Sequence, residues 1–335
     1  MREIPTISDP VRVLHLSGEE AEELSREVRR LAAERHAVIL AHNYQVPEVQ
    51  AVADFVGDSL ALSRQAADTE ADVIAFCGVH FMAETASILS PDKTVLIPDL
   101  EAGCSLSDSI TGKELRNWKS RHPGAVAVMY VNTSAEVKAE TDYCCTSSNA
   151  VQVVEHVYSE HGPDTEILFG PDMWLGSYVE RVTGRRMHLW PGECHVHAGI
   201  RAEDVERQRA EHPDAELLIH PECACLQQVL DRADGPKAGA GVHVESTGGM
   251  LRQVQQRPDG EFIVATETGM LDPLTRAAPR ARLTAANPMA VCKYMKTITL
   301  PTLRDSLRDG RFEVRVPPEI AERARTPIER MVAIG

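Results

Sequence analysis

The sequence has little positive charge and no long apolar run. Its 335 residues carry 35 Lys and Arg against 50 Asp and Glu, which gives a formal net charge of −15. Nucleic acids and anionic membrane surfaces both require clustered basic residues, so this balance argues against either partner. No apolar run approaches the roughly 20 residues of a membrane span, and the first residues, MREIPTISDP, do not resemble a secretory signal.

Cysteine is also sparse. Eight cysteines in a chain of this length are too few for a disulfide scaffold. The sequence therefore predicts a cytoplasmic protein with reduced thiols. In that compartment a cysteine in a loop is more often a ligand or a reactive group than half of a bridge.

Three of the cysteines are almost evenly spaced. Cys104, Cys194 and Cys292 each lie in a short loop marked by Gly or Pro after an apolar run, 90 and 98 residues apart. The runs VILAHNY, AVMYVN and LLIHPE begin at positions 38, 127 and 217, at intervals of 89 and 90. This repeat predicts three similar units, each of which delivers one thiolate to a common point. Three thiolates can hold a metal cluster and leave one coordination position open.

Short runs rich in Val, Ile and Leu alternate with polar loops and helical patterns along the chain. We expect strands near 37–41, 73–77, 94–97, 126–131, 166–169, 187–190, 216–219, 241–244 and 262–265. Such apolar strands suit parallel sheets that are buried on both faces and joined by right-handed helical crossovers. The predicted class is α/β, with three similar three-layer αβα domains that have parallel sheets around a pseudo-threefold axis.

The expected domains are 1–103, with an amphipathic helix at 18–35, then 104–193 and 194–291. A C-terminal segment, 292–335, would carry the third cysteine and pack back on the first domain. The stretches 231–241, with the sequence DRADGPKAGAG, and 271–288, with its three prolines, are expected to be the loosest segments.

Polar groups recur where the strands end and where helices begin. Ligands of open parallel sheets bind beyond the carboxyl ends of the strands, so we expect these groups to meet in one central cavity. The set at strand ends is His42, Asn43, Tyr44, Tyr130, Asn132, His220 and Glu222, and the set at helix starts is Asp58-Ser59, Ser147-Ser148 and Ser246-Thr247. Ser59, Ser147 and Thr247 also fit helix N-caps. The helix N-termini would attract anions, and His42 and His220 could carry charge or shuttle protons near neutral pH.

Six stretches, in this order, resemble the quinolinate synthase family: AHNYQVPEVQAVADFVGDSL, FMAETASIL, YVNTSAEVKAETDYCCTSSNAV, CHVH, HPEC and ESTGGM. The resemblance covers roughly residues 36–300. It implies three αβα domains around one [4Fe–4S] cluster per chain. It also implies the condensation of iminoaspartate with dihydroxyacetone phosphate to quinolinate, phosphate and water in NAD biosynthesis, with a possible transient contact to an L-aspartate oxidase.

Carried over residue by residue, the resemblance makes Cys104, Cys194 and Cys292 the cluster ligands. The implied substrate-binding residues are His42, Ser59, Tyr130, Asn132, Ser147, His220, Glu222 and Thr247. Tyr44, His220 and Glu222 are the implied proton-transfer residues. Some family members carry the third ligand in a CxxCxxC cluster, whereas Cys292 has no neighbouring thiol here, so a disulfide switch at this position is not expected.

Two other functions would use parts of the same sequence. In the first, Cys223-x-Cys225 and His195-x-His197 would form the zinc site of a hydrolase or an aldolase, although neither pattern has a recognised zinc spacing. In the second, the chain would be an iron–sulfur redox sensor, although it has no basic or helix-turn-helix appendage.

Other residues have plainer interpretations. We expect Cys77, Cys144, Cys145 and Cys225 to be buried structural residues, whereas Cys223 is ambiguous. Phe81 and Met82 are expected in the core. The sequence assigns no role to His195 and His197, and it does not give the oligomeric state.

Overall fold

The structure, a computed structural model, describes residues 14, 16–233 and 241–334 and contains three parallel sheets of four strands. The first sheet consists of β1 (Ala37–His42), β2 (Phe55–Gly57), β3 (Val73–Cys77) and β4 (Thr94–Leu96). The second consists of β5 (Val126–Tyr130), β6 (Tyr143–Cys145), β7 (Ile167–Gly170) and β8 (His188–Leu189). The third consists of β9 (Glu216–Ile219), β10 (Val242–Val244), β11 (Glu261–Ala265) and β12 (Arg282–Ala285).

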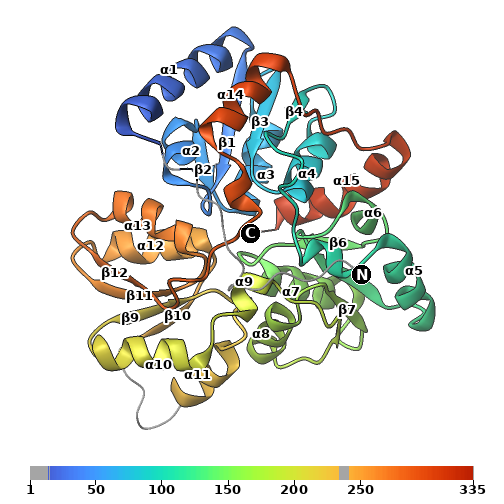
Figure 1. The fold of residues 1–335 in the computed structure, drawn as a ribbon. Helices are drawn as coiled ribbons and strands as arrows, with labels where there is room; N and C mark the ends of the chain where they lie inside the picture. Colours follow the sequence, from blue (N-terminus) through green and yellow to red (C-terminus); the bar gives the residue numbers. More distant parts are fainter. Residues whose placement is uncertain (1–13, 15, 234–240, 335) are drawn as a thin grey trace.

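The three sheets have the same topology. Numbered within each unit, the strands are ordered 2-1-3-4 in all three, as β2-β1-β3-β4, β6-β5-β7-β8 and β10-β9-β11-β12. Figure 1 shows the three units arranged around a common centre. The predicted α/β class, with three similar αβα units around a pseudo-threefold axis, is therefore confirmed.

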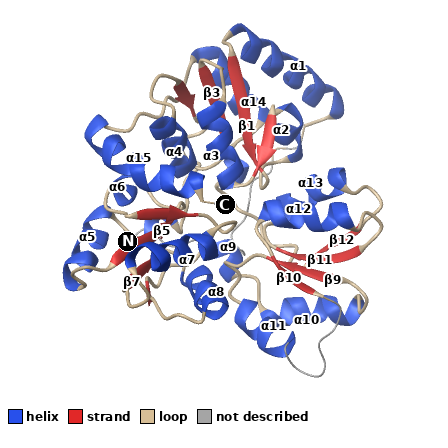
Figure 2. Ribbon diagram, turned by 180° about the vertical axis from the view of Figure 1, so that it is seen from behind, coloured by secondary structure: helices blue, strands red, loops and turns tan. Residues whose placement is uncertain are grey.

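Helices cover both faces of each sheet, because the crossover direction reverses after the second strand. The crossover from strand 1 to strand 2 moves along the sheet in one direction. The crossovers from strand 2 to strand 3 and from strand 3 to strand 4 move in the opposite direction, so right-handed connections place their helices on the opposite face. The third unit shows this clearly in Figure 2, where the sheet separates α10 (Ala202–Glu211) and α11 (Leu226–Ala233) from α12 (Thr247–Gln256) and α13 (Leu271–Ala277). The helices equivalent to α12 and α13 are α3 (Ser59–Asp68) and α4 (His80–Leu89) in the first unit, and α7 (Ala150–His161) and α8 (Met173–Thr183) in the second.

The other faces of the first two sheets carry the remaining helices. α1 (Gly18–Glu34) and α2 (Pro47–Val52) belong to the first unit, and α5 (Gly112–Arg121) and α6 (Ala135–Lys138) belong to the second. The predicted amphipathic helix at 18–35 matches α1, which begins at a capping box between Ser17 and Glu20 and buries Val28, Leu31 and Ala32.

All nine expected strands are present, but three further strands were missed. β2, β6 and β12 have three, three and four residues and lie at sheet edges. The expected loose stretch 271–288 is wrong in part, because α13 and β12 lie within it. Its prolines do not prevent this, since Pro273 falls in the first turn of α13, where no backbone donor is needed. Most of the other stretch, 234–240, lies outside the described residues.

The C-terminal segment contains two helices that join the first two units. α14 (Leu300–Asp309) packs against α1, and α15 (Pro318–Ala333) packs against α4, α6 and β6. Asn149, just before α7, holds the end of α15 by donating hydrogen bonds to the carbonyls of Met331 and Ile334. Among the described residues, no helix is long and apolar enough to cross a membrane.

Candidate active site

One cavity lies where the three units meet, and its empty space, counted together with the part open to solvent, is about 720 Å³. The twelve residues that the resemblance assigned to the site all line it: His42, Tyr44, Ser59, Cys104, Tyr130, Asn132, Ser147, Cys194, His220, Glu222, Thr247 and Cys292. Asn43 and Ser246, which were also expected there, are not among the lining residues. Further lining residues include Asp58, Phe81, Met82, His195, His197, Glu267 and Tyr294. The structure therefore brings together side chains that are spread over 250 residues of sequence.

The convergence follows from equivalent positions in the three units. His42, Tyr130 and His220 lie at or directly after the carboxyl ends of β1, β5 and β9, the first strand of each unit. In the order 2-1-3-4 this strand borders the point where the crossovers change face, and ligands of open α/β sheets bind there. The loops with Ser59, Ser147 and Thr247 follow the second strands, and those with the cysteines follow the fourth strands.

The three hydroxyl residues at helix starts are not the N-caps that the sequence suggested. The N-cap of α3 is Asp58, and that of α12 is Ser246, whose side chains accept from Ala61 and Gly249. Ser59 and Thr247 are therefore the first helical residues, and Asn149 rather than Ser147 stands at the cap of α7. Their hydroxyls are not used for capping. Asp58 also adds a carboxylate at one helix start, which offsets the positive end of that helix.

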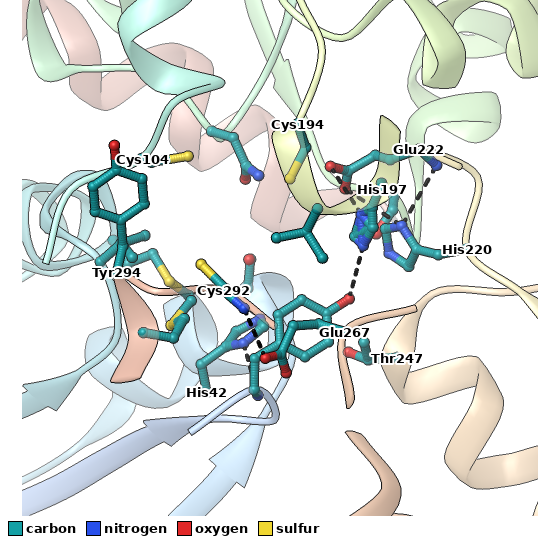
Figure 3. Close-up of a pocket in the computed structure, with 18 of the residues that line it drawn as sticks. His42, Cys104, Cys194, His197, His220, Glu222, Thr247, Glu267, Cys292 and Tyr294 are labelled. Atoms are coloured by element: carbon teal, nitrogen blue, oxygen red, sulfur yellow. Dashed lines mark hydrogen bonds and ion pairs between the residues drawn. The ribbon is translucent and has the colours of Figure 1, made fainter. Parts of the chain in front are cut away.

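The three cysteines face a common space, as Figure 3 shows. Burial raises the pKa of the Cys104 thiol to about 12 and that of Cys292 to about 11. The pKa of Cys194 rises further, through burial and the charges of Glu222 and of the other two thiols. Three buried thiols that face one space need a cation to hold them as thiolates, which is the donor chemistry of an iron–sulfur cluster.

Glu222 is the centre of a buried polar network. Its Oε1 accepts a hydrogen bond of 2.5 Å from the Tyr130 hydroxyl, and His220 Nδ1 lies 3.5 Å from the same oxygen. Burial raises the pKa of Glu222 to about 7, although the bond from Tyr130 opposes the shift. A carboxyl group with this pKa can both accept and donate a proton near neutral pH.

Burial favours the neutral form of the imidazoles, so of the two roles expected for His42 and His220, charge and proton shuttling, the first is not supported. Burial lowers the pKa of His42 to about 4, and the nearby Lys296 adds to this while Asp58 opposes it. Burial also lowers the pKa of His197 to about 3, and the pKa of His220 falls well below its usual value. In this environment the rings are hydrogen-bonding groups, and they do not attract anions by charge.

The sequence reasoning missed a buried ion pair beside the Cys292 loop. Lys296 Nζ lies 3.0 Å from Glu267 Oε1 and donates to the carbonyl of Tyr44. Glu267 Oε1 also accepts from the backbone N–H of Cys292 at 2.9 Å. Glu267 follows the third strand of its unit, β11, and its position after a strand end was the available signal. The pair ties the Tyr44 loop to the loop of the third cysteine.

His197, which the sequence left unassigned, belongs to the site. Its Nε2 lies 3.3 Å from Thr266 Oγ1 and 3.4 Å from the Tyr44 hydroxyl, and its ring stacks on that of His220. Tyr44 in turn shares a 2.6 Å hydrogen bond with Thr266. Tyr44 therefore touches this network from another unit of the fold.

Two residues expected in the core, Phe81 and Met82, also contact the cavity. Phe81 and Met82 are 4% exposed and also form part of the cavity wall, so they are both core and lining residues. Cys77, Cys144, Cys145 and Cys225 are buried, as expected, and so is Cys223, whose thiol donates to the carbonyl of Ala265.

Over the described residues, two groups of three metal-ligating side chains lie within 4.8 Å, and neither contains Cys223 or Cys225. The zinc site proposed from CxC and HxH is therefore not assembled.

The buried neutral His42 predicts a specific sensitivity to acid. The pKa of His42 is about 4 in the folded protein and about 6.5 for an exposed histidine, so the unfolded chain binds more protons between these two values. The free energy of unfolding therefore falls as the pH drops from about 6.5 towards 4, and the loss from His42 reaches about 2 kcal/mol near pH 5. The free energy of unfolding, measured with urea at about pH 7.5 and about pH 5, should fall less between these two pH values in His42→Asn than in the wild type.

His156→Asn, at a half-exposed position on α7, is the matched control and should keep the wild-type loss. Equal acid losses in the wild type and in His42→Asn would contradict a neutral buried His42.

The fold and the cavity together define a class of protein: an α/β enzyme of three similar units that share one site with three cysteines. Comparison with known proteins identifies the family. The model of the family described as quinolinate synthetase A protein matches residues 26–333, so the chain belongs to this family.

Several curated relatives are similar over nearly the whole chain. The quinolinate synthase of Mycobacterium sp. (strain KMS) is 56% identical over 316 residues, which cover 94% of this chain and 93% of the relative. That of Mycobacterium tuberculosis (strain ATCC 25618 / H37Rv) is also 56% identical over 316 residues, with 94% and 89% covered. That of Mycolicibacterium paratuberculosis is 56% identical over 311 residues, with 92% and 88% covered.

Proposed function

We propose that this chain is a quinolinate synthase, which condenses iminoaspartate with dihydroxyacetone phosphate to form quinolinate, phosphate and water in NAD biosynthesis. The observation that carries the proposal is the convergence of twelve side chains, chosen from the sequence, on one cavity between three units. Membership of the quinolinate synthetase A family also supports it.

We also propose that Cys104, Cys194 and Cys292 hold one [4Fe–4S] cluster. One thiol follows the fourth strand of each sheet, the three sulfurs face a common space, and their raised pKa values fit thiols that require a cation. When bound, such a cluster supplies an iron with an open position that acts as a Lewis acid in the loss of water.

The hydroxyl residues are the proposed binding groups for the anionic parts of the substrates. Thr247 begins α12 and accepts a hydrogen bond from Asn43 Nδ2 at 2.9 Å, which fixes its hydroxyl group. Ser59 begins α3, and both helices present unsatisfied backbone N–H groups at this end. Phosphate and carboxylate groups would bind there, together with Ser147, without a cluster of lysines. His42, Asn132 and Tyr130 complete the proposed binding set.

Glu222, His220 and Tyr44 are the proposed proton-transfer residues. Condensation of a ketose phosphate with an imine requires a proton to leave one carbon and protons to reach the leaving groups. Glu222, with a pKa of about 7, can exchange a proton with the substrate and is held in place by Tyr130. His220 Nδ1 lies 3.5 Å from Glu222 Oε1, so it is placed to relay a proton to or from that carboxyl group. Tyr44 is held by Thr266 and can donate a hydrogen bond or a proton.

Three further points complete the proposal. The reaction is placed in the cytoplasm, where cluster thiols stay reduced. Iminoaspartate comes from an enzyme that oxidises aspartate, an L-aspartate oxidase, through a transient contact. The domain boundaries follow the repeat at 1–103, 104–193 and 194–291, with 292–335 as a segment that carries Cys292.

The test is product formation under anaerobic conditions. The protein, iminoaspartate and dihydroxyacetone phosphate should give quinolinate and phosphate in equal amounts, and omission of either substrate should give none. Turnover of dihydroxyacetone phosphate without quinolinate would contradict the proposal.

A further inference from the structure

Cys194, His197 and Glu222 form a compact group of three metal-ligating side chains inside the cavity. One ligand atom of each lies within 4.8 Å of the others, and His197 Nδ1 is 3.8 Å from Glu222 Oε2. The group is drawn in Figure 3, where the Cys194 sulfur and His197 lie on the same side of the cavity as Glu222. Its members come from two neighbouring segments, since Cys194 and His197 flank the first turn of α9 (His195–Ala198).

The remaining atoms of these side chains are already held by other partners. Glu222 Oε1 accepts the bond from Tyr130, which leaves Oε2 facing His197. His197 Nε2 lies against the hydroxyls of Thr266 and Tyr44, so it can donate its proton there. A neutral imidazole that donates from Nε2 carries its free electron pair on Nδ1, and this is the atom that faces Glu222.

His197 Nδ1 is itself unusual. The side chain is only 3% exposed, and this nitrogen has no hydrogen-bond partner among the described residues. Buried polar atoms are nearly always bonded, so an unsatisfied nitrogen beside a thiol and a carboxylate calls for an explanation. A metal ion between the three atoms would satisfy it.

Charge and geometry also fit a divalent ion. A thiolate and a carboxylate together carry two negative charges, which one divalent ion neutralises in a buried position. Ligand distances of about 2.3 Å to sulfur and 2.0–2.2 Å to nitrogen and oxygen imply ligand atoms roughly 3.3–3.6 Å apart in a tetrahedral site. The 3.8 Å between His197 Nδ1 and Glu222 Oε2 therefore has to shorten by a few tenths of an ångström, and the two distances to the Cys194 sulfur, both within 4.8 Å, by at most about 1.2 Å.

We propose that, when the chain lacks its cluster, Cys194, His197 and Glu222 form a second metal site for one divalent transition-metal ion such as Zn²⁺. The ion displaces the proton of the Cys194 thiol to solvent and keeps a fourth position open to the cavity. Zinc binding and cluster assembly exclude each other, because both require the Cys194 thiolate. The competition rests on the proposed cluster function, whereas the zinc site itself rests only on these three side chains.

The test uses Co²⁺ as a spectroscopic probe of the iron-free, reduced full-length protein. A second group, His122, Glu166 and His188, lies on the surface and would also bind the probe, so all variants carry His122→Ala and His188→Ala. Co²⁺ should bind at close to one ion per chain, with the thiolate charge-transfer band and the visible bands of a tetrahedral site.

The cysteine variants separate this site from the cluster site. Cys104→Ser and Cys292→Ser should keep the cobalt band, although neither should assemble a cluster. Cys194→Ser should lose the band, and His197→Ala and the isosteric Glu222→Gln should weaken binding by about tenfold or more. A band that survives in Cys194→Ser, or one that disappears in Cys104→Ser and Cys292→Ser alike, would overturn the proposal.

The competition is measured separately. Protein loaded with Zn²⁺ should take up iron and sulfide more slowly than apoprotein, and a chelator should restore the rate. His197→Ala should take up iron at the same rate with or without Zn²⁺. This variant binds Zn²⁺ weakly at the proposed site, whereas its three cluster cysteines are intact. Equal slowing by Zn²⁺ in the wild type and in His197→Ala would contradict the competition. A failure of cluster assembly in every protein would count against the proposed function and leave the cobalt result unaffected.

Discussion

Replacement of Cys104, Cys194 or Cys292 by Ser is expected to remove the iron and to abolish quinolinate formation. Each cysteine lies after the fourth strand of a different sheet, so the three positions do not replace one another. The two thiols that remain are buried, and their raised pKa values favour the protonated form, which does not bind iron. Lewis-acid catalysis by a metal contributes several kcal/mol, so turnover should fall by about a thousandfold or more. Iron, sulfide and quinolinate are measured after anaerobic reconstitution.

Cys77→Ala and Cys225→Ala are the matched controls. Cys77 lies inside β3 and Cys225 is 2% exposed just before α11, and neither lines the cavity. Both variants should keep their iron and most of their turnover, with some loss of stability from the lost packing. A full cluster in Cys194→Ser would show that the ligand assignment is wrong.

Replacement of Glu222 by Gln is expected to stop turnover while the cluster remains bound. The amide keeps the shape of the side chain and its bond with Tyr130, but it cannot accept or release a proton in the range where Glu222 does. General acid–base groups contribute about a hundredfold to ten-thousandfold in rate, and we expect a loss in that range. The measurements are quinolinate formation and iron content on the same preparation.

Glu193→Gln provides the comparison for this variant. Glu193 directly precedes Cys194 but is exposed and outside the cavity lining, so its substitution should leave both iron and turnover unchanged. Loss of iron in Glu222→Gln would mean that this carboxylate supports the cluster site structurally and is not a proton-transfer residue.

Much of the site could be predicted because the chemistry repeats with the fold. His42, Tyr130 and His220 occur at equivalent strand ends, and an interval of about 90 residues is visible without any structure. The strands that carry them are long and apolar enough to be recognised. β2, β6 and β12 were missed because three or four residues at a sheet edge show too little apolar pattern.

The contacts that hold the site together could not be predicted in the same way. Lys296 reaches the carbonyl of Tyr44 across 252 positions, and neither residue has a local pattern that signals the contact. The neutral state of His42 also depends on burial, which only the assembled cavity produces. The caps of α3 and α12 differ by a single residue from those expected, which is enough to free the hydroxyls of Ser59 and Thr247.

The most direct test of the account is the iron and sulfide content of the wild-type protein, purified without oxygen and assayed for quinolinate formation. The account predicts about four irons and four sulfides per chain, a brown colour and turnover in the same preparation. A colourless, iron-free protein after anaerobic reconstitution would contradict the three-cysteine cluster at the centre of the account.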